Sequence, residues 1–355
     1  MHEIQKRKTN QWIQTPLQIG NRTIDSRLVF APMSGLGHVA FRELLSDYGH
    51  YGLLFSEMSS AKAIPHENRH VSPVFRWRDC ERHQLVWQLL GNSPKDMAKA
   101  AQRIAREEFF GVDINMSCSA ARIYKRGMGA CLLKYKDQAL DIVRSVRDAV
   151  DIPLFVKFRT GWLDKSSRLK LEPSNLVDQA IEFACRLEEC GVDAVTFHPR
   201  VAPDRRTRPP KWSHIAKVKQ AVNIPVFGNG NVFDDNDCEK IYSETACDGI
   251  SLGRIALAKP WIFAELKGVF QPDDSTYPTT IFRYMDLLEK HYNPQQAMKR
   301  LIKFSKYFCA GFQFGNALRS NIKKAQNFDN IRRVYGQFFD SPVLLNTRPN
   351  ENLFV

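Results

Sequence analysis

Short apolar runs recur along the chain, and each is followed by a stretch in which apolar residues have helical spacing. Eight such runs lie between residues 28 and 253, and they are rich in Val, Ile, Leu or Phe with little polar alternation. They are Leu28–Met33, Gly52–Met58, Leu85–Leu90, Val112–Met116, Leu154–Arg159, Asp193–His198, Pro225–Asn229 and Gly249–Gly253. Continuous apolar runs are typical of parallel strands buried on both faces. Eight strand–helix units in about 240 residues predict a closed (β/α)8 TIM barrel rather than an open doubly wound sheet.

The intervening segments carry the signals of helix ends. Ser93–Glu108 begins with a capping serine followed by Pro94, and Pro173–Cys190 ends at Gly191. Both patterns are typical of amphipathic helices. Helices are also expected at 211–222 and 234–244. The segment Leu17–Ser26 predicts a small hairpin that closes the bottom of the barrel.

The composition changes after Gly268. A polar stretch with two prolines, residues 271–280, predicts a linker, and residues 281–339 have helical spacing without a strand pattern. Residues 281–340 contain eleven Lys or Arg and four acidic residues. We therefore expect two domains: a catalytic barrel over residues 1–270 and a basic all-α domain over 275–345.

The charge of the whole chain points in the same direction. The chain has 51 Lys and Arg against 38 Asp and Glu, which gives a net charge of +13. Such an excess predicts a polyanionic partner, most simply a nucleic acid. The alternative is a solvated basic surface that aids solubility.

Cysteine usage and hydropathy exclude other classes of protein. The eight cysteines are scattered without a CxxC pair, so we expect reduced thiols and neither a disulfide scaffold nor a metal site. No apolar run approaches the roughly 20 residues of a membrane span. The polar N-terminus lacks the apolar core of a signal peptide. These features predict a cytoplasmic protein, and we expect a monomer.

Polar residues gather where the predicted strands end, which is where barrel enzymes place their chemistry. Each alone also has a structural explanation, but a polar residue at the end of nearly every strand indicates a site. They are Glu57, Gln88, Asn115 with the nearby Cys118, Lys157, Arg159, His198, Arg200, Asn229, Gly230, Gly253 and Arg254. Glycines after the last two strands, followed by Arg254, predict a phosphate grip.

At these positions the chain resembles the tRNA-dihydrouridine synthase family. The matching motifs occur in family order and cover most of residues 28–265. They are APMSGLGHVAFR (31–42), SEM (56–58), QLLG (88–91), DINMSC (113–118), KFRTGW (157–162), FHPR (197–200), GNGNV (228–232) and LGRIALAKPWIF (252–263). The helical tail matches the RNA-binding domain of the family more loosely.

The resemblance implies FMN at the barrel mouth and roles for individual residues. Pro32 and Met33 would present backbone to the flavin ring, Gln88 would bind the ring edge, and Lys157 would hold its N1/O2 side. His198 would lie by the ring or phosphate. The phosphate would be held by Asn229, Gly230, Gly253 and Arg254.

The resemblance also implies the chemistry. Flavin reduced by NADPH would deliver hydride to C6 of a uridine in tRNA, and Cys118 would give a proton to C5. A thiol suits this role because it is protonated at neutral pH and able to transfer its proton. The competing interpretation of Cys118 is a buried, inert thiol. Asn115, Arg159 and Arg200 would bind the substrate.

Two loops depart from the family pattern. Ser117 and Ser119 flank Cys118 where the family has Gly and Pro, and Pro199 stands in the usual His-Gly-Arg. We infer a divergent member. Two alternatives share its fold and cofactor: the same reaction on another RNA such as rRNA, and a flavin-dependent reductase of a small pyrimidine. A third alternative is a non-catalytic RNA-binding relative that has kept the fold.

Overall fold

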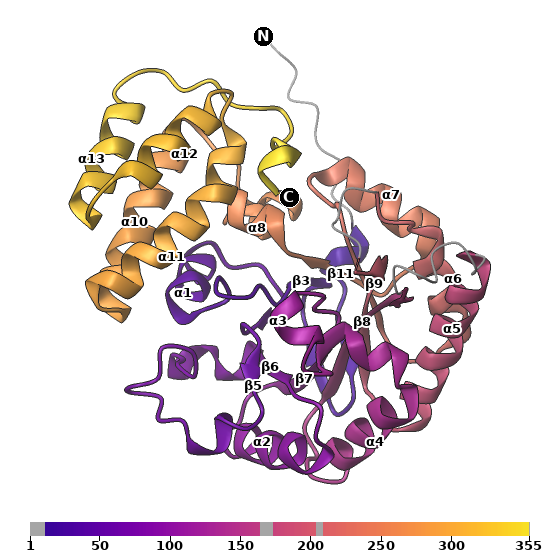
Figure 1. Ribbon diagram of the computed structural model, residues 1–355. Coiled ribbons are helices and arrows are strands. Elements are labelled where there is room, and N and C mark those ends of the chain that lie inside the picture. The colour runs from indigo at the N-terminus through magenta and orange to yellow at the C-terminus, as the bar shows by residue number, and fades with distance from the viewer. Residues whose placement is uncertain (1–10, 164–172, 204–208, 355) are drawn as a thin grey trace.

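The barrel is closed, as the sequence predicts. The computed structural model describes residues 11–163, 173–203 and 209–354, and within them eight parallel strands form a ring in which β4 pairs with β6 and β11 pairs with β3 (Figure 1). The strands are β3 (Leu28–Phe30), β4 (Leu53–Phe55), β6 (Leu85–Leu90), β7 (Gly111–Met116), β8 (Leu154–Trp162), β9 (Ala194–Ala202), β10 (Val226–Asn229) and β11 (Gly249–Leu252). A two-residue strand, β5 (Ser59–Ser60), extends the pairing of β6.

Helices surround the ring, and two of them begin at residues whose side chains cap the helix, one being the predicted Ser93. Ser93 Oγ accepts a hydrogen bond from the amide of Asp96, and Asp234 Oδ1 accepts one from Asp237, which satisfies amides that have no partner inside the helix. The helices are α1 (Val39–Tyr48), α2 (Pro94–Arg106), α3 (Ala121–Tyr124), α4 (Lys136–Arg147), α5 (Pro173–Glu189), α6 (Ser213–Ala221), α7 (Asp235–Thr245), α8 (Arg254–Ala258) and α9 (Ile262–Leu266). None of the helices in the described residues is both long and apolar enough to cross a membrane.

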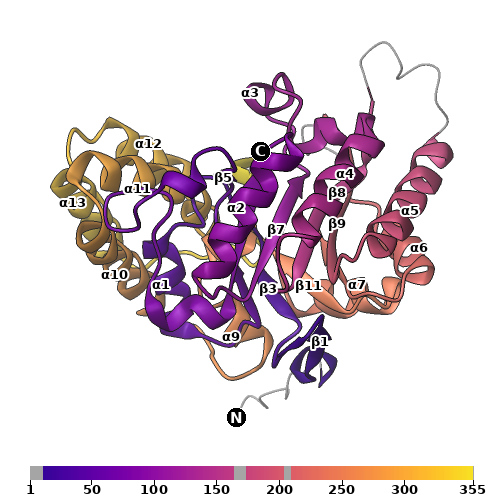
Figure 2. The same ribbon diagram turned by 90° about the horizontal axis from the view of Figure 1, so that it is seen from below.

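The predicted hairpin is β1 (Leu17–Ile19) paired with β2 (Arg22–Ile24), and it lies at the opposite end of the barrel from α3 (Figure 2). Its apolar side chains join the lower strand residues in one buried cluster, in which the rings of Phe55 and Phe155 meet edge to face at 5.4 Å. This end of the barrel interior is therefore filled by apolar side chains.

Two strands are longer than predicted. β8 and β9 continue past their expected ends at 159 and 198, and their pairing reaches Trp162 opposite Ala202. Lys157 and His198 therefore lie inside strands rather than at their ends. Gly161 in β8 and Pro199 in β9 concealed this extension, because glycine and proline are uncommon inside strands.

The expected linker at 271–280 is wrong in its second half, because α10 (Thr276–His291) begins there. Asp273 Oδ1 accepts hydrogen bonds from the amide of Ser275 and the hydroxyl of Thr276, and Pro278 falls in the first turn, where a missing amide hydrogen costs little. Three further helices follow: α11 (Pro294–Phe308), α12 (Gly315–Lys324) and α13 (Phe328–Phe339).

The C-terminal helices share a hydrophobic core with the outside of the barrel. Phe41 of α1 packs against Tyr284 of α10 and Phe304 of α11, with ring centroids 6.0 and 5.7 Å apart. Figure 1 shows these helices beside α1 and α8. The division into two domains remains a prediction, since the apolar contacts continue across the proposed boundary.

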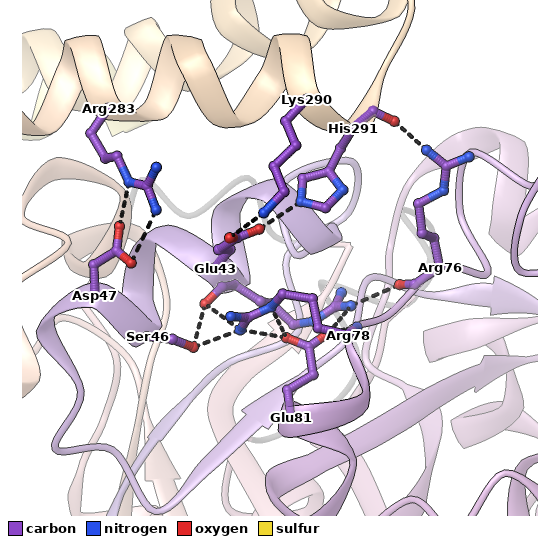
Figure 3. A network of polar contacts seen from close by, with 10 residues as sticks. Glu43, Ser46, Asp47, Arg76, Arg78, Glu81, Arg283, Lys290 and His291 are labelled. Atoms are coloured by element: carbon purple, nitrogen blue, oxygen red, sulfur yellow. Dashed lines mark hydrogen bonds and ion pairs between the residues drawn. The ribbon is translucent and has the colours of Figure 1, made fainter.

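Ion pairs reinforce this contact on its polar margin (Figure 3). Glu43 accepts hydrogen bonds from Lys290 Nζ at 2.7 Å and from His291 Nε2 at 2.6 Å, and Asp47 pairs with Arg283 Nε at 2.8 Å. One helical turn of α1 separates the two carboxylates, so both face α10. The C-terminal helices are thereby held in one orientation against α1.

Candidate functional site

A hydrogen-bonded group joins three side chains of β6 and β7 inside the barrel. Gln88 donates from Nε2 to Asp113 Oδ2 at 2.6 Å and accepts from Asn115 Nδ2 at 2.8 Å. All three side chains are buried. Burial raises the pKa of Asp113 to about 7. Asp113 carried no role in the sequence analysis, although a charged residue within an apolar run, two positions before Asn115, shares its strand face.

The same asparagine positions Cys118. Its Oδ1 accepts hydrogen bonds from the amides of Ser117 at 3.1 Å and Cys118 at 3.0 Å, just beyond the end of β7. Across the loop, Gly129 has a φ of +62°, and a Cβ there would lie 2.6 Å from the carbonyl oxygen of Cys118. Cys118 is a half-buried free thiol. Its backbone is thus fixed from two sides while its side chain lies at the rim.

Arg159 adds a third restraint on this loop. It donates from Nε to the carbonyl oxygen of Ser117 at 2.8 Å. The guanidinium therefore reaches from β8 to the Cys118 loop, and its role in binding the substrate stays a prediction.

Lys157 lies deeper in the barrel. Its Nζ donates to Asn229 Oδ1 at 3.1 Å, and Asn229 Nδ2 donates to the carbonyl oxygen of Ser251 at 2.7 Å. Burial lowers the pKa of Lys157 to about 7. Asn229, which the resemblance assigns to the phosphate, thus lies beside Lys157.

A second cationic group forms after β9, β10 and β11. Arg200 and Arg254 both donate to Asn231 Oδ1, at 3.2 and 2.8 Å, and Arg200 also donates to His198 Nε2 at 2.9 Å. Because arginine only donates, His198 accepts through Nε2 and is neutral. Burial and the surrounding cations hold the pKa of His198 well below its usual range. Asn231 was not singled out in sequence, although it ends the Gly-Asn-Gly-Asn run.

Glycine keeps the backbone accessible around this group. A Cβ on Gly253 would lie 3.2 Å from Met33 Sδ, which places the loop after β3 beside the start of α8. Gly230 has a φ of +134°, a conformation that other residues rarely adopt. Two guanidinium groups around a neutral amide and exposed backbone form a donor set suited to an anion such as phosphate.

The loop with Pro32 and Met33 is held from both sides. Glu57 accepts a hydrogen bond from the amide of Gly35 at 2.7 Å, and Lys303 of α11 donates to the carbonyl oxygen of Ser34. Burial raises the pKa of Glu57. The C-terminal helices therefore contact the site through this loop.

Several cations of the C-terminal helices bind groups of the protein while remaining at least partly exposed. Besides Arg283, Lys290 and Lys303, Arg300 donates to the carbonyl oxygen of Pro73 at 3.0 Å, and Arg332 pairs with Asp286 and Glu289 at 2.9 Å. Lys323 and Lys324, by contrast, are exposed at the end of α12. The cations of this region therefore divide into those with partners in the protein and those, such as Lys323 and Lys324, at the surface of α12.

A (β/α)8 barrel with polar and cationic side chains at one end of its strands and a thiol at the rim defines a barrel enzyme. The sequence model of the dihydrouridine synthase (Dus) family matches residues 29–339. The chain belongs to the dihydrouridine synthase family.

Individual relatives agree with this membership. The chain is 32% identical over 313 residues to "Probable tRNA-dihydrouridine synthase 1" of Synechocystis sp., covering 86% of this chain and 84% of that one. It is 28% identical over 330 residues to "tRNA-dihydrouridine synthase B" of Pseudomonas aeruginosa, covering 91% and 96%.

Solved structures share the fold at low sequence identity. The old yellow enzyme from Trypanosoma cruzi matches with a TM-score of 0.52 and 13% identity, covering 78% of this chain and 98% of that one. The 6-hydroxypseudooxynicotine amine oxidase from Pseudomonas geniculata N1 matches with a TM-score of 0.53 and 15% identity, covering 73% and 50%. These likenesses support the barrel fold alone.

Proposed function

We propose that this protein reduces uridine to 5,6-dihydrouridine in tRNA, with FMN as its cofactor and NADPH as the reductant. The observation that carries the proposal is the placement of Cys118, which Asn115 and Gly129 hold at the rim of a barrel whose interior is cationic. The names of the curated relatives support the choice of uridine in tRNA.

The donor set of the barrel suits a phosphorylated flavin. Arg254 with the backbone at Gly230 and Gly253 would hold the phosphate, and the neutral His198 would lie beside it. Arg200, which the resemblance placed with the substrate, shares Asn231 with Arg254 and would also face the phosphate. Pro32 and Met33 would lie along the ring.

Lys157 and Gln88 would contact the ring itself. When bound and reduced, the flavin supplies a hydride to C6 of the uracil. Lys157 would place a cation at the N1/O2 side of the ring, where it would stabilise the negative charge of the reduced flavin. Hydrogen bonds to Asp113 and Asn115 fix the orientation of Gln88, so its amide would be pre-set for the ring edge.

Cys118 would complete the reduction by transferring its thiol proton to C5 of the uracil. Asn115 and Arg159 would act partly through the loop, since both bond to its backbone. The target base has to leave its stack to reach the barrel mouth. The exposed Lys323 and Lys324 would contribute to binding the RNA backbone.

An anaerobic half-reaction tests the proposal. The purified protein is loaded with FMN and reduced with NADPH, and flavin reoxidation is followed by absorbance after addition of unmodified tRNA. Fast reoxidation with formation of dihydrouridine is the expected result. Reoxidation by rRNA or by free pyrimidines, but not by tRNA, would mean that one of these is the substrate and that tRNA is not. Failure to bind FMN would overturn the proposal and favour a non-catalytic RNA-binding protein.

A further inference from the structure

The chain after α13 returns to the barrel. It first binds the turn at Cys309–Gly311: the amide of Asn346 donates to the carbonyl oxygen of Gly311 at 2.8 Å, and the amide of Asn350 donates to that of Ala310 at 2.8 Å. It then forms a single helical turn, Glu351–Phe354, which lies near α7 and α8 in Figure 1. Phe354 is fully buried, so this return is part of the packed structure.

Phe354 fills a position between the loops that follow β10 and β11. Its ring packs against Phe233 with centroids 5.7 Å apart, and against Tyr307 of α11 at 5.9 Å. The guanidinium of Arg254 lies 5.3 Å from the centre of the same ring. A cation over an aromatic face at this distance is attracted to it. One aromatic side chain therefore contacts both loops.

Arg348 and Glu351 hold the loop after β10 through charge. Arg348 pairs with Asp234 at 3.2 Å and Asp237 at 3.0 Å at the start of α7, and it lies 4.6 Å from the centre of the Phe233 ring. Glu351 Oε2 accepts a hydrogen bond from Asn231 Nδ2 at 3.5 Å. The amide nitrogen of Asn231 therefore faces Glu351, and its oxygen faces Arg200 and Arg254.

We propose that residues 341–354 form a clasp that positions Asn231 and Arg254 and so selects and retains a phosphorylated flavin. The inference rests on the proposed function, because it takes the cationic group at Asn231 as the phosphate site. Phe354, Arg348 and Glu351 are positioning residues that act through Asn231 and Arg254. The clasp would affect binding of the flavin phosphate, whereas residues of β6, β7 and β8 would bind the ring.

Comparison of FMN with riboflavin, which lacks the phosphate, isolates this role. Dissociation constants for both flavins are measured by fluorescence quenching for the wild type and for Phe354→Ala and Arg348→Gln. We expect each variant to weaken FMN binding about ten-fold, the order of one cation–π contact or charged hydrogen bond, while riboflavin affinity stays the same. The matched control is Leu353→Ala, which removes an adjacent buried side chain that has no ring contact with Arg254.

The outcomes separate the clasp from the proposed function. If FMN binds the wild type and the variants equally, or if riboflavin weakens as much as FMN, the clasp is overturned and the cofactor stands. An equal effect of Leu353→Ala on FMN alone also overturns the specific role of Phe354. A wild type that binds neither flavin overturns the cofactor and the clasp together. Arg348→Gln keeps the test valid if Phe354→Ala does not fold, because Arg348 is 43% exposed.

A basic groove on the side of the barrel supports a second inference. Residues 61–66 form one wall and α2 forms the other, with a free volume of about 330 Å³. Five of the nine lining residues are basic and one is acidic: Lys62, His66, Lys99, Arg103 and Arg106 against Asp96. Lys62, Lys99 and Arg106 are exposed, and the described residues provide none of them with an ion-pair partner.

The groove is connected to the C-terminal helices through one short segment. Arg103 lies 5.3 Å from the centre of the Phe75 ring, and the carbonyl oxygen of Pro73 accepts a hydrogen bond from Arg300 of α11. Exposed cations without counter-charges along a groove suit a phosphodiester backbone. We infer that the RNA proposed as substrate extends along this groove, an assignment that rests on the proposed function.

Charge reversal tests the groove. We compare two double variants that change the net charge equally. The groove variant is Lys99→Glu with Arg106→Glu, and the control is Lys217→Glu on α6 with Arg144→Glu on α4. We expect the groove variant to bind tRNA about ten-fold more weakly. The slope of log affinity against log salt concentration should become less steep by about two. Unchanged FMN content reports folding. Equal affinity in both variants overturns the groove, whereas a wild type that does not bind tRNA also overturns the proposed substrate.

Discussion

Lys157 Nζ lies 3.1 Å from Asn229 Oδ1, so the buried ammonium of β8 has a neutral amide as its hydrogen-bond partner. A buried cation with a neutral partner gives up its proton readily, and burial lowers the pKa of Lys157 to about 7. Deprotonation of this lysine near neutral pH gives the site a pH dependence that can be measured.

We expect FMN affinity to fall as the pH rises above 7. If the protonated lysine favours the flavin, binding raises its pKa, and each pH unit above the pKa of the free protein costs up to about ten-fold in affinity. Binding measured between pH 7 and 9 checks this, with Lys157→Met as the pH-independent control. A wild-type affinity that stays constant over this range would remove the ammonium from flavin binding.

Replacement of Cys118 by serine should lower the rate of dihydrouridine formation by about 10²–10⁴-fold, the usual contribution of a positioned proton donor. FMN affinity and the rate of reduction by NADPH should not change. Cys190→Ser is the matched control, because both thiols are half-buried and free. Single-turnover formation of dihydrouridine is measured, and a fully active Cys118→Ser protein would exclude the acid role.

Gly129→Ala should displace Cys118, because the new Cβ would lie 2.6 Å from its carbonyl oxygen. The control is Gly49→Ala, which also has a positive φ, +69°, but whose Cβ would meet no atom of the described residues within 4 Å. Both variants place an alanine at a positive φ, so a change in the environment of Cys118 seen only in Gly129→Ala reports the steric contact. The rate of alkylation of Cys118, followed by peptide mass spectrometry, should change only in Gly129→Ala. Equal rates in the two variants would mean that the loop adapts.

The pair of Arg42 and Glu81 should be among the costliest to break. It joins α1 to the segment before β6 at 2.7 Å, and both side chains are almost fully buried. Arg78 also donates to Glu81, at 2.9 Å. Glu81→Gln should lower the free energy of unfolding by about 3–5 kcal/mol, because it leaves a buried guanidinium without its counter-charge.

The exposed pair of Arg144 and Asp141, also at 2.9 Å, is the control for this change. Asp141→Asn should cost about 0–1 kcal/mol, since water screens the pair. Urea denaturation measures both variants. Similar losses for the two pairs would show that burial is not what gives the Arg42 contact its strength.

Much of the barrel could be predicted from sequence because its signals are local. Eight apolar runs, the capping Ser93 and Asp234 and the hairpin at 17–26 all depend on residues that are close in the chain. The relation of Asn115 to Cys118 is also local, because three residues separate them. The apolar runs also placed candidate site residues on neighbouring strands, although β8 and β9 extend past Lys157 and His198.

Contacts between distant segments were not predictable in this way. Asp113 meets Gln88 only because two strands pair in one register, and Arg300 meets Pro73 only because α11 docks beside that loop. The basic tail predicts an RNA-binding surface, yet several of its cations also bind carboxylate or carbonyl groups of the protein. Charge composition does not predict which group a basic side chain will bind.

The sequence by itself determined the barrel, the order of its strands and the residue types at its mouth, since each follows from short-range periodicity and capping. Only the tertiary structure decided that β8 and β9 extend past Lys157 and His198, and that Phe354 reaches Arg254 from a hundred residues away in the chain. The physical reason is that contacts between residues far apart in the chain depend on how the packed core brings their segments together. Local sequence patterns do not specify which remote segments will be neighbours.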